Sequence, residues 1–335
     1  MKITKNGILR INYRYIAIND NWFWEILHKA KEKFPSLVRI LKRRGARDYT
    51  QSRPALKCNF NCSYCIFRWA RRHPFSEEHF LQTKLVWDQL AQLEDRILVR
   101  ISFDGETLID KWAMECALYI NKIPNVEICE FLTNNSVDPA AYLDRIDPRK
   151  TTFNCSFHPE KISFEKFLGH IDTLREAGCR AIANMVMTPQ AVKNLPDLYQ
   201  SFEEKNVRFR PCLLHGYYEG KVFPHDYTAQ ELDIIRKHSY SEFEFEYMAG
   251  KASKGLMCYA GVDMLNVFLD GSVKRCSFVK IGHIKDLVSG KVKLRKDPYP
   301  CPHDDCINYS HMMGLEDFRE QYDLSEDFVD DYSLK

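Results

Sequence analysis

Three cysteines lie close together in the chain, spaced C-x3-C-x2-C at Cys58, Cys62 and Cys65. They follow the short extended run 53–57, so we expect them on one tight loop. Three thiolates on one loop can hold three corners of a four-iron four-sulfur cube, because iron–sulfur clusters require soft thiolate ligands. The fourth iron would then have no protein ligand and could bind a small molecule. A zinc knuckle or a purely structural cluster is the alternative, since C-x2-C half-motifs also bind zinc.

Polar side chains follow several of the strands that we expect after this loop. In barrels and open α/β sheets the binding site forms at the carboxyl ends of the parallel strands. Side chains with hydrogen-bonding groups at that edge suit a ligand with hydroxyl and carboxylate groups. The candidates are Asp104, Glu106, Asn134, Ser156, His158 and Asn184. An ordinary solvated loop is the alternative for the acidic residues, and a structural role is the alternative for a lone histidine.

The octet 58–65 resembles the cluster-binding signature of the radical S-adenosylmethionine (SAM) superfamily, including the aromatic residue Tyr64 before the last cysteine. The resemblance implies that the amino and carboxylate groups of SAM chelate the open iron. It also implies that one electron from the cluster cleaves SAM to methionine and a 5'-deoxyadenosyl radical. That radical would abstract a hydrogen atom from the substrate.

The motifs downstream resemble the same family in the same order. Asp104-Gly105-Glu106-Thr107 stands where the family usually has Gly-Gly-Glu-Pro, which implies a loop that holds the SAM amino group. Asp104 replaces a glycine there, and Thr107 replaces the proline. The segment 133–136 resembles the family's Thr-Asn-Gly. Asn134 matches the asparagine of that motif, and Asn135 stands in place of the glycine. Asparagine tolerates the left-handed backbone that such a turn uses.

The fourth and fifth expected strands supply the remaining cofactor candidates. Ser156 stands where the family often contacts the SAM ribose, and His158 could contact SAM or substrate. Asn184, on the fifth strand, is a similar candidate. The sixth strand contains Cys212, and a thiol near a radical site could return a hydrogen atom to the substrate radical. Cysteine is also among the most buried residue types, so a core position is the alternative for Cys212. We expect four other cysteines in the core, namely Cys116, Cys129, Cys155 and Cys179.

A second set of cysteines lies in the last third of the chain, at Cys258, Cys276, Cys301 and Cys306. Asp270-Gly271 between two apolar runs predicts a β-hairpin, which would bring Cys258 and Cys276 to one end. The spacing C-x12-G-x4-C from Cys258 to Cys276 resembles the SPASM/Twitch extension of radical SAM enzymes. The resemblance implies one auxiliary four-iron four-sulfur cluster, ligated by all four cysteines. Zinc is the alternative, because four thiolates also form zinc sites, and His303 could replace one thiolate.

The elements that must position these residues show a βα rhythm from 51 to about 214, which predicts a parallel sheet covered by helices. We expect six strands, at 52–57, 97–103, 126–133, 151–157, 181–187 and 207–213. We expect helices at 75–95, 107–122, 138–146, 163–177 and 192–205. Gly178 is placed to end a helix, and Asp138-Pro139 to begin one. Six strands match the partial (β/α)6 TIM-like barrel that the resemblance implies.

The predicted fold class is therefore α/β, with a small C-terminal Twitch-like domain. We expect a basic N-terminal extension at 1–50, the barrel at 51–215, the Twitch-like region at 216–310 and an acidic tail at 311–335. Residues 1–57 contain 14 Lys and Arg against 4 Asp and Glu, so 14 minus 4 gives +10. Residues 296–335 contain 3 against 11, so 3 minus 11 gives −8. The basic, aromatic segment 20–44 could contact an anionic membrane surface or an acidic partner, or simply pack on its own domain.

Overall composition excludes several classes of protein. The formal net charge of the 335 residues is only +2, so no nucleic-acid partner is expected. Twelve cysteines in a chain this long do not indicate a disulfide scaffold. No signal-peptide pattern and no apolar run of 18 residues is present in the sequence. We expect a cytoplasmic protein, because a reducing compartment suits oxygen-sensitive clusters.

The resemblance predicts a radical SAM enzyme of oxidoreductase type that needs an external one-electron reductant such as flavodoxin or ferredoxin. A fully ligated auxiliary cluster suits electron transfer, which favours oxidation, or a related rearrangement, of a small polar molecule such as a sugar or aminocyclitol. The alternative is a peptide- or protein-modifying maturase that forms epimers, thioethers or formylglycine. The 50 residues before the barrel are short for the leader-binding element of such enzymes. A hypothesis of another class is an iron–sulfur electron-transfer protein without SAM chemistry.

Overall fold

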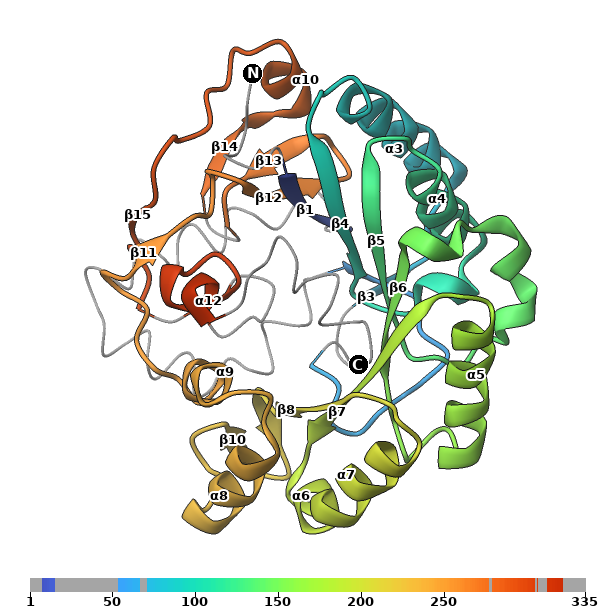
Figure 1. Ribbon diagram of the computed structural model, residues 1–335, viewed down its shortest axis with the longest axis vertical. Helices are drawn as coiled ribbons and strands as arrows, with labels where there is room; N and C mark the ends of the chain where they lie inside the picture. The colour runs from blue at the N-terminus through green and yellow to red at the C-terminus, as the bar shows by residue number, and fades with distance from the viewer. Residues whose placement is uncertain are drawn as a thin grey trace.

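A computed structural model describes residues 8–15, 54–66, 71–276, 279–304, 306 and 312–321 (Figure 1). The segment 20–44, for which a membrane or acidic partner was considered, lies outside these residues, as does the end of the predicted acidic tail, 322–335. The chain forms a mixed α/β fold around a parallel sheet, which confirms the predicted class. None of the described helices has the length and apolar character needed to cross a bilayer.

The strands of the main sheet come from the whole length of the described chain. They are β1 (Ile8–Tyr15), β4 (Arg96–Phe103), β5 (Val126–Thr133), β6 (Thr151–Ser156), β7 (Arg180–Met187), β8 (Phe209–Leu213), β12 (Met264–Phe268), β13 (Ser272–Lys274) and β14 (Lys280–His283). Within the described residues they form one nine-stranded sheet in the order β14-β13-β12-β1-β4-β5-β6-β7-β8. All neighbours from β12 to β8 are parallel, whereas β13 and β14 are antiparallel.

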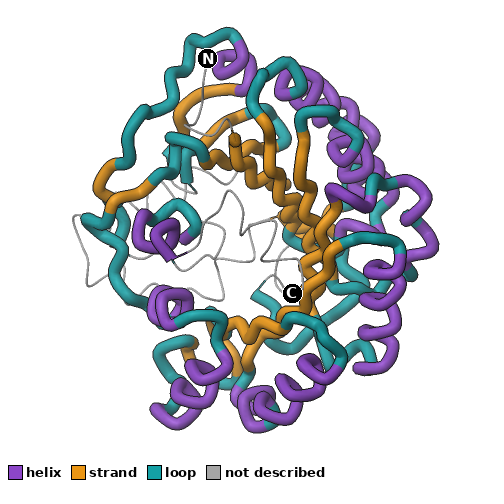
Figure 2. Tube along the Cα trace, in the orientation of Figure 1, coloured by secondary structure: helices purple, strands orange, loops and turns teal. Residues whose placement is uncertain are grey.

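Helices cover the outer face of this sheet, and the sheet itself curves around the inner side (Figures 1 and 2). The α-helices are α3 (Glu77–Leu90), α4 (Lys111–Asn121), α5 (Phe164–Glu176), α6 (Pro189–Lys193), α7 (Leu195–Glu204), α8 (Ala229–His238), α9 (Glu242–Met248), α10 (Ile284–Val288) and α12 (Glu316–Gln321). Short 3-10 turns are η1 (Thr107–Ile109), η2 (Pro139–Ala141), η3 (Leu143–Arg145) and η4 (Pro148–Lys150). In the part of the chain that the structure describes there are also three two-stranded sheets. They pair β2 (Pro54–Leu56) with β3 (Arg71–His73), β9 (Gly216–Tyr218) with β10 (Lys221–Phe223), and β11 (Met257–Cys258) with β15 (Tyr299–Pro300).

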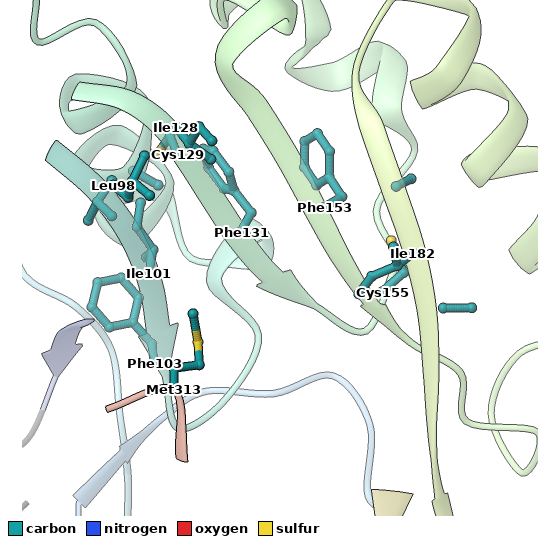
Figure 3. Close-up of a cluster of buried hydrophobic side chains, with 14 of the residues drawn as sticks. Leu98, Ile101, Phe103, Ile128, Cys129, Phe131, Phe153, Cys155, Ile182 and Met313 are labelled. Carbon is teal, nitrogen blue, oxygen red and sulfur yellow. The ribbon is translucent and has the colours of Figure 1, made fainter. Parts of the chain in front are cut away.

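The alternation of side chains along each strand places one set of residues against the helices and the other set on the inner face. On β5, Phe131 faces the helices and stacks on Phe153 of β6, with ring centroids 5.3 Å apart. These two residues are register partners, so their rings meet directly across the strands (Figure 3). Glu130, between Cys129 and Phe131, points to the inner face instead. One part of the core therefore lies between sheet and helices, and the inner face carries polar groups such as Glu130 beside buried apolar ones such as Ile128.

Several of the predicted helix boundaries agree with the structure. Gly178 follows α5 with a φ of +87°, and Cys179 N donates to Leu174 O at 3.0 Å, which is the expected glycine C-cap. The helix expected at 138–146 was wrong in type, since this stretch forms the 3-10 turns η2 and η3. Tyr142 leaves the helical backbone at a φ of −144°, and its buried ring packs on Phe153 at 5.7 Å. Burial of this aromatic ring competes with a regular helix.

The first strand of the sheet also differs from the prediction. The strand expected at 52–57 is only β2, which pairs with β3 and not with the main sheet. The place beside β4 is taken by β1, whose eight residues pair with β4 along its full length, from Ile8 opposite Arg96 to Tyr15 opposite Phe103. A long strand satisfies more backbone groups than a three-residue strand that begins with Pro54, which has no N–H to donate.

The region after β10 extends the same sheet. The predicted hairpin is confirmed, because β12 and β13 are antiparallel and Gly271 between them has a φ of +76°. On its other side β12 pairs in parallel with β1, with Asn12 opposite Asn266. The first described strand thus lies beside a strand that follows it by about 250 residues in the chain. The division of the chain into four domains stays a prediction.

Candidate functional site

The three cysteines of the first motif lie on the loop that follows β2. Cys65 N donates to Cys62 O at 3.2 Å, which closes a tight turn, and Phe60 N lies 3.4 Å from Cys58 Sγ. Cys62 is buried, and Cys58 and Cys65 are half-buried. Burial, followed by the nearby charges of Cys65 and Cys58, raises the pKa of Cys62 to about 12. Binding of a cation would favour the deprotonated form of these thiols, and soft sulfur donors fit iron.

No three His, Cys, Asp or Glu side chains in the described part of the chain are arranged to hold a single metal ion. The three thiols nevertheless belong to one loop, and none of the described cysteines forms a disulfide. The donor set therefore fits three corners of an iron–sulfur cluster, as predicted from the spacing. The assignment of these three residues as ligands remains a prediction.

The loop after β4 packs directly against the start of the cysteine loop. Glu106 N donates to Lys57 O at 3.0 Å. A Cβ atom at Gly105 would lie 2.3 Å from Leu56 O, which is far closer than real atoms approach. Only glycine lets the two backbones come together here. Gly105 thus has a packing role in addition to the cofactor role predicted for it, and its neighbour Asp104 is half-buried in the same loop.

Glu106 is completely buried, and its carboxylate joins two loops. One oxygen accepts from Leu108 N at 3.0 Å and from Thr133 Oγ1 at 2.9 Å, and the other accepts from Asn134 N at 2.5 Å. Burial raises the pKa of Glu106, and these three hydrogen bonds oppose that shift. The carboxylate therefore ties the loop after β4 to the loop after β5. Its predicted contact with the SAM amino group stays a prediction.

Asn134 connects the loop after β5 to the cysteine loop. Its Nδ2 donates to Asn59 Oδ1 at 2.9 Å and lies 3.8 Å from Cys58 Sγ. Asn59 in turn donates to Ser136 Oγ at 2.9 Å. Asn135 has a φ of +55°, so the left-handed backbone expected at this position is confirmed. The cysteine loop is held from this side by two amide side chains.

The loop after β6 holds the cysteine loop from the other side. His158 Nδ1 lies 2.7 Å from Tyr64 Oη and 3.4 Å from Cys62 Sγ. Ser63 donates through its backbone N and its hydroxyl to the carboxylate of Glu160, at 3.2 and 2.6 Å. Burial lowers the pKa of His158 to about 4, so its imidazole is neutral near pH 7. Burial also raises the pKa of Tyr64.

A row of hydrogen bonds on the inner face leads to Ser156. Ser156 Oγ donates to Asn184 Oδ1 at 3.0 Å, and Asn184 Nδ2 donates to Asn154 Oδ1. Asn154 Nδ2 donates to Glu130 Oε1 at 2.9 Å, and Glu130 accepts two hydrogen bonds from Arg100. A carboxylate only accepts, so it fixes the direction of every donor in the row. Ser156 must donate to Asn184, which leaves its lone pairs for a donor group on a ligand.

The sequence reasoning found Ser156 and Asn184 but missed Glu130, Asn154 and Arg100. A signal was present, because Glu130 and Asn154 are polar residues within otherwise apolar strands of a sheet. Glu130 is 1% exposed and Arg100 11% exposed, so this is a buried ion pair. Such pairs are costly to desolvate, and removal of one partner is strongly destabilising.

Cys212 lies on β8, in the same sheet as this row of hydrogen bonds. Its Sγ is 3.8 Å from Arg210 O. Burial, and then the charge of Glu244, raise the pKa of Cys212 to about 12, so the thiol is protonated at neutral pH. A protonated thiol is the state that a hydrogen-atom donor needs, and this role stays a prediction.

The second cysteine set gathers around Tyr299. Cys258 and Tyr299 are paired in register across β11 and β15, and Cys276 Sγ lies 3.7 Å from His303 Nε2. Burial raises the pKa of Tyr299, and so do the nearby charges of Cys258, Cys276 and Cys301. Three of the four predicted ligands therefore lie close to one ring. Cys306 is half-buried near Tyr247, whose pKa it helps to raise.

Comparisons with known proteins give matches among solved structures. No family model and no curated protein matches the sequence. The chain is similar to anSMEcpe with bound AdoMet, at 16% identity over 71% of this chain and 79% of that chain, with a TM-score of 0.46. It is similar to Streptococcus suis SuiB bound to S-adenosylmethionine, at 13% identity over 81% of this chain and 71% of that chain, with a TM-score of 0.49. It is also similar to BtrN in complex with AdoMet and 2-DOIA, at 14% identity over 81% of this chain and 89% of that chain, with a TM-score of 0.34.

These matched proteins are radical SAM enzymes of the SPASM/Twitch type, which is the family that the two cysteine motifs resemble. Identities of 13–16% and TM-scores below 0.5 are too low to transfer the activity of these proteins to this chain.

Proposed function

We propose that this chain is a radical SAM enzyme that cleaves S-adenosylmethionine reductively and abstracts a hydrogen atom from its substrate. The observation that carries the proposal is the convergence of Cys58, Cys62 and Cys65 on one loop beside the carboxyl edge of the parallel sheet. Three separate loops hold that loop in place, through Gly105, Asn134 and His158 and their neighbours. A four-iron four-sulfur cluster bound there would supply one electron to SAM chelated at the open iron.

The chain's own residues would orient the cofactor. Ser156 presents hydroxyl lone pairs that can accept from a ribose hydroxyl, as the direction of the hydrogen-bond row requires. Asn184 holds Ser156 in that orientation. The buried carboxylate of Glu106 joins the loops after β4 and β5, which both contact the cysteine loop. These features support SAM as the ligand of this edge.

The substrate that we propose is a small polar molecule of the sugar or aminocyclitol type. This class is supported by the polar row on the inner face, in which Arg100, Glu130, Asn154 and Asn184 are linked by hydrogen bonds. Cys258, Cys276, Cys301 and Cys306 would hold an auxiliary four-iron four-sulfur cluster that accepts an electron from the substrate radical. Loss of a proton from that radical, together with transfer of the electron, would complete a two-electron oxidation of the substrate.

The first test is anaerobic reconstitution with iron and sulfide, followed by reduction in the presence of SAM. We expect about eight irons per chain and release of 5'-deoxyadenosine. Cys62→Ala should abolish cleavage of SAM, whereas Cys179→Ala, which changes a buried cysteine outside both sets, should leave it intact. Iron-loaded protein that produces no deoxyadenosine would instead indicate an electron carrier, and zinc-loaded, unreactive protein would refute the proposal.

The second test addresses the auxiliary cysteines and the substrate. Cys276→Ala should lower the iron content to about four per chain and retain some SAM cleavage, but it should stop product formation. Incubation with deuterated polyols, aminocyclitols and peptides then identifies the substrate class by transfer of deuterium into 5'-deoxyadenosine. Transfer from a peptide alone would replace the small-molecule assignment with the maturase alternative.

A further inference from the structure

His158 meets two different groups with a single nitrogen. Its Nδ1 is 2.7 Å from Tyr64 Oη and 3.4 Å from Cys62 Sγ. The ring is held in this position from two sides. It stacks on the Tyr64 ring at 5.9 Å with an interplanar angle of 15°, and it meets the Phe60 ring edge-on at 5.7 Å and 81°. The contact with Cys62 is therefore built into the packing of the cysteine loop.

The chemistry of the two partners decides which form of the imidazole is stable. A neutral imidazole nitrogen carries either a proton or a lone pair, so Nδ1 cannot donate to one partner and accept from the other. A thiolate bound to iron carries no proton and can only accept. A lone pair on Nδ1 would face the sulfur lone pairs unfavourably. The Tyr64 hydroxyl can either donate or accept, so it tolerates both forms.

We propose that His158 is a positioning residue for the cluster held by Cys58, Cys62 and Cys65, and that its Nδ1–H donates a hydrogen bond to the Cys62 thiolate. This inference rests on the proposed function, because it needs a cluster at these cysteines. A hydrogen bond to a ligand sulfur stabilises the more negative, reduced cluster, and so raises its reduction potential. His158 thereby makes the first electron transfer to the site easier.

The assay is a redox titration of the anaerobically reconstituted full-length protein, followed by electron paramagnetic resonance. The relevant signal is the one that changes when SAM is added. His158→Phe keeps an aromatic ring between Tyr64 and Phe60 but removes the donor. We expect the equilibrium constant for one-electron reduction to fall about tenfold, which is about 59 mV.

Two matched variants separate a hydrogen bond from a general packing effect. His158→Asn places an amide N–H near the position of Nδ1 and should restore most of the potential. His238→Leu changes a histidine of α8 whose Nδ1 contacts Ile234 O at 2.8 Å, and it should leave the potential unchanged. A potential in His158→Phe equal to that of the wild type would overturn the inference while leaving the proposed function intact. A wild-type protein without any SAM-sensitive signal would instead remove the proposed function.

A measurement on the wild type decides the matter if His158→Phe does not take up iron. Isotopically labelled histidine should give a weak nitrogen coupling to the reduced cluster in pulsed electron paramagnetic resonance, and the coupling should be lost in His158→Asn. Absence of that coupling in the wild type overturns the proposed hydrogen bond.

Discussion

Replacement of Gly105 by alanine should disturb the cysteine loop from a position outside it. The added Cβ would lie 2.3 Å from Leu56 O, 2.7 Å from Leu56 C and 2.8 Å from Leu56 Cβ. An ordinary contact begins near 3.4 Å, so 3.4 minus 2.3 requires a shift of about 1 Å. Leu56 is fully buried and lies two residues before Cys58, so it has no space to move without the cysteine loop.

The expected cost follows from this overlap. Forcing extra atoms into a packed interior costs about 1–3 kcal/mol. The shift would also stretch the hydrogen bond from Glu106 N to Lys57 O, which is 3.0 Å long. We therefore expect Gly105→Ala to lower the free energy of unfolding of the iron-free protein by about 1–3 kcal/mol. We also expect less iron per chain after reconstitution, because Cys58 is displaced.

Gly169 provides the matched control. It lies within α5 on the surface, and a Cβ there would meet nothing within 4 Å. Gly169→Ala should therefore raise the free energy of unfolding by about 0.5–1 kcal/mol, because alanine favours the helix, and should leave iron uptake unchanged. Urea unfolding followed by circular dichroism measures the first quantity, and colorimetric iron analysis the second. If Gly105→Ala unfolds like the wild type and binds as much iron, the close contact with Leu56 does not govern the cysteine loop.

Three further outcomes are expected. Glu130→Ala removes a buried carboxylate that pairs with Arg100, and it should lower the free energy of unfolding, measured in urea, by about 3–5 kcal/mol. Glu127→Ala breaks the exposed pair with Arg96 on the same two strands and should cost less than about 1 kcal/mol. Equal costs would contradict the assigned burial. Burial raises the pKa of Cys212 to about 12, so its thiol should react with iodoacetamide at pH 8 far more slowly than an ordinary cysteine. The rate of alkylation, measured by mass spectrometry, should increase as the pH rises. Rapid alkylation at pH 8 would show that the thiol is ionised. Removal of iron by a chelator should lower the thermal unfolding temperature, since iron binds the folded cysteine loop only. Identical melting curves for the iron-loaded and the chelator-treated protein would argue against a cluster at this loop.

The amino-acid sequence by itself determined the features that depend on short stretches of chain. The strand expected at 126–133 coincides with β5, and the strands from β4 to β8 were all located from their apolar runs. Gly178 and Gly271 were placed correctly because a left-handed backbone at a helix end or hairpin favours glycine. The spacing of Cys58, Cys62 and Cys65 also pointed to cluster chemistry, because three ligands on one loop lie close together in the sequence.

The tertiary structure alone decided which distant segments meet. Strand pairing uses backbone groups that every residue carries, so the sequence could not reveal that β1 and not β2 lies beside β4. The ion pair of Glu130 and the contact of His158 with Cys62, 96 residues away in the chain, likewise depend on the register of neighbouring strands and on loop packing. Short-range patterns fix dihedral preferences and the facing of side chains, whereas contacts across the sheet arise only when the whole fold is assembled.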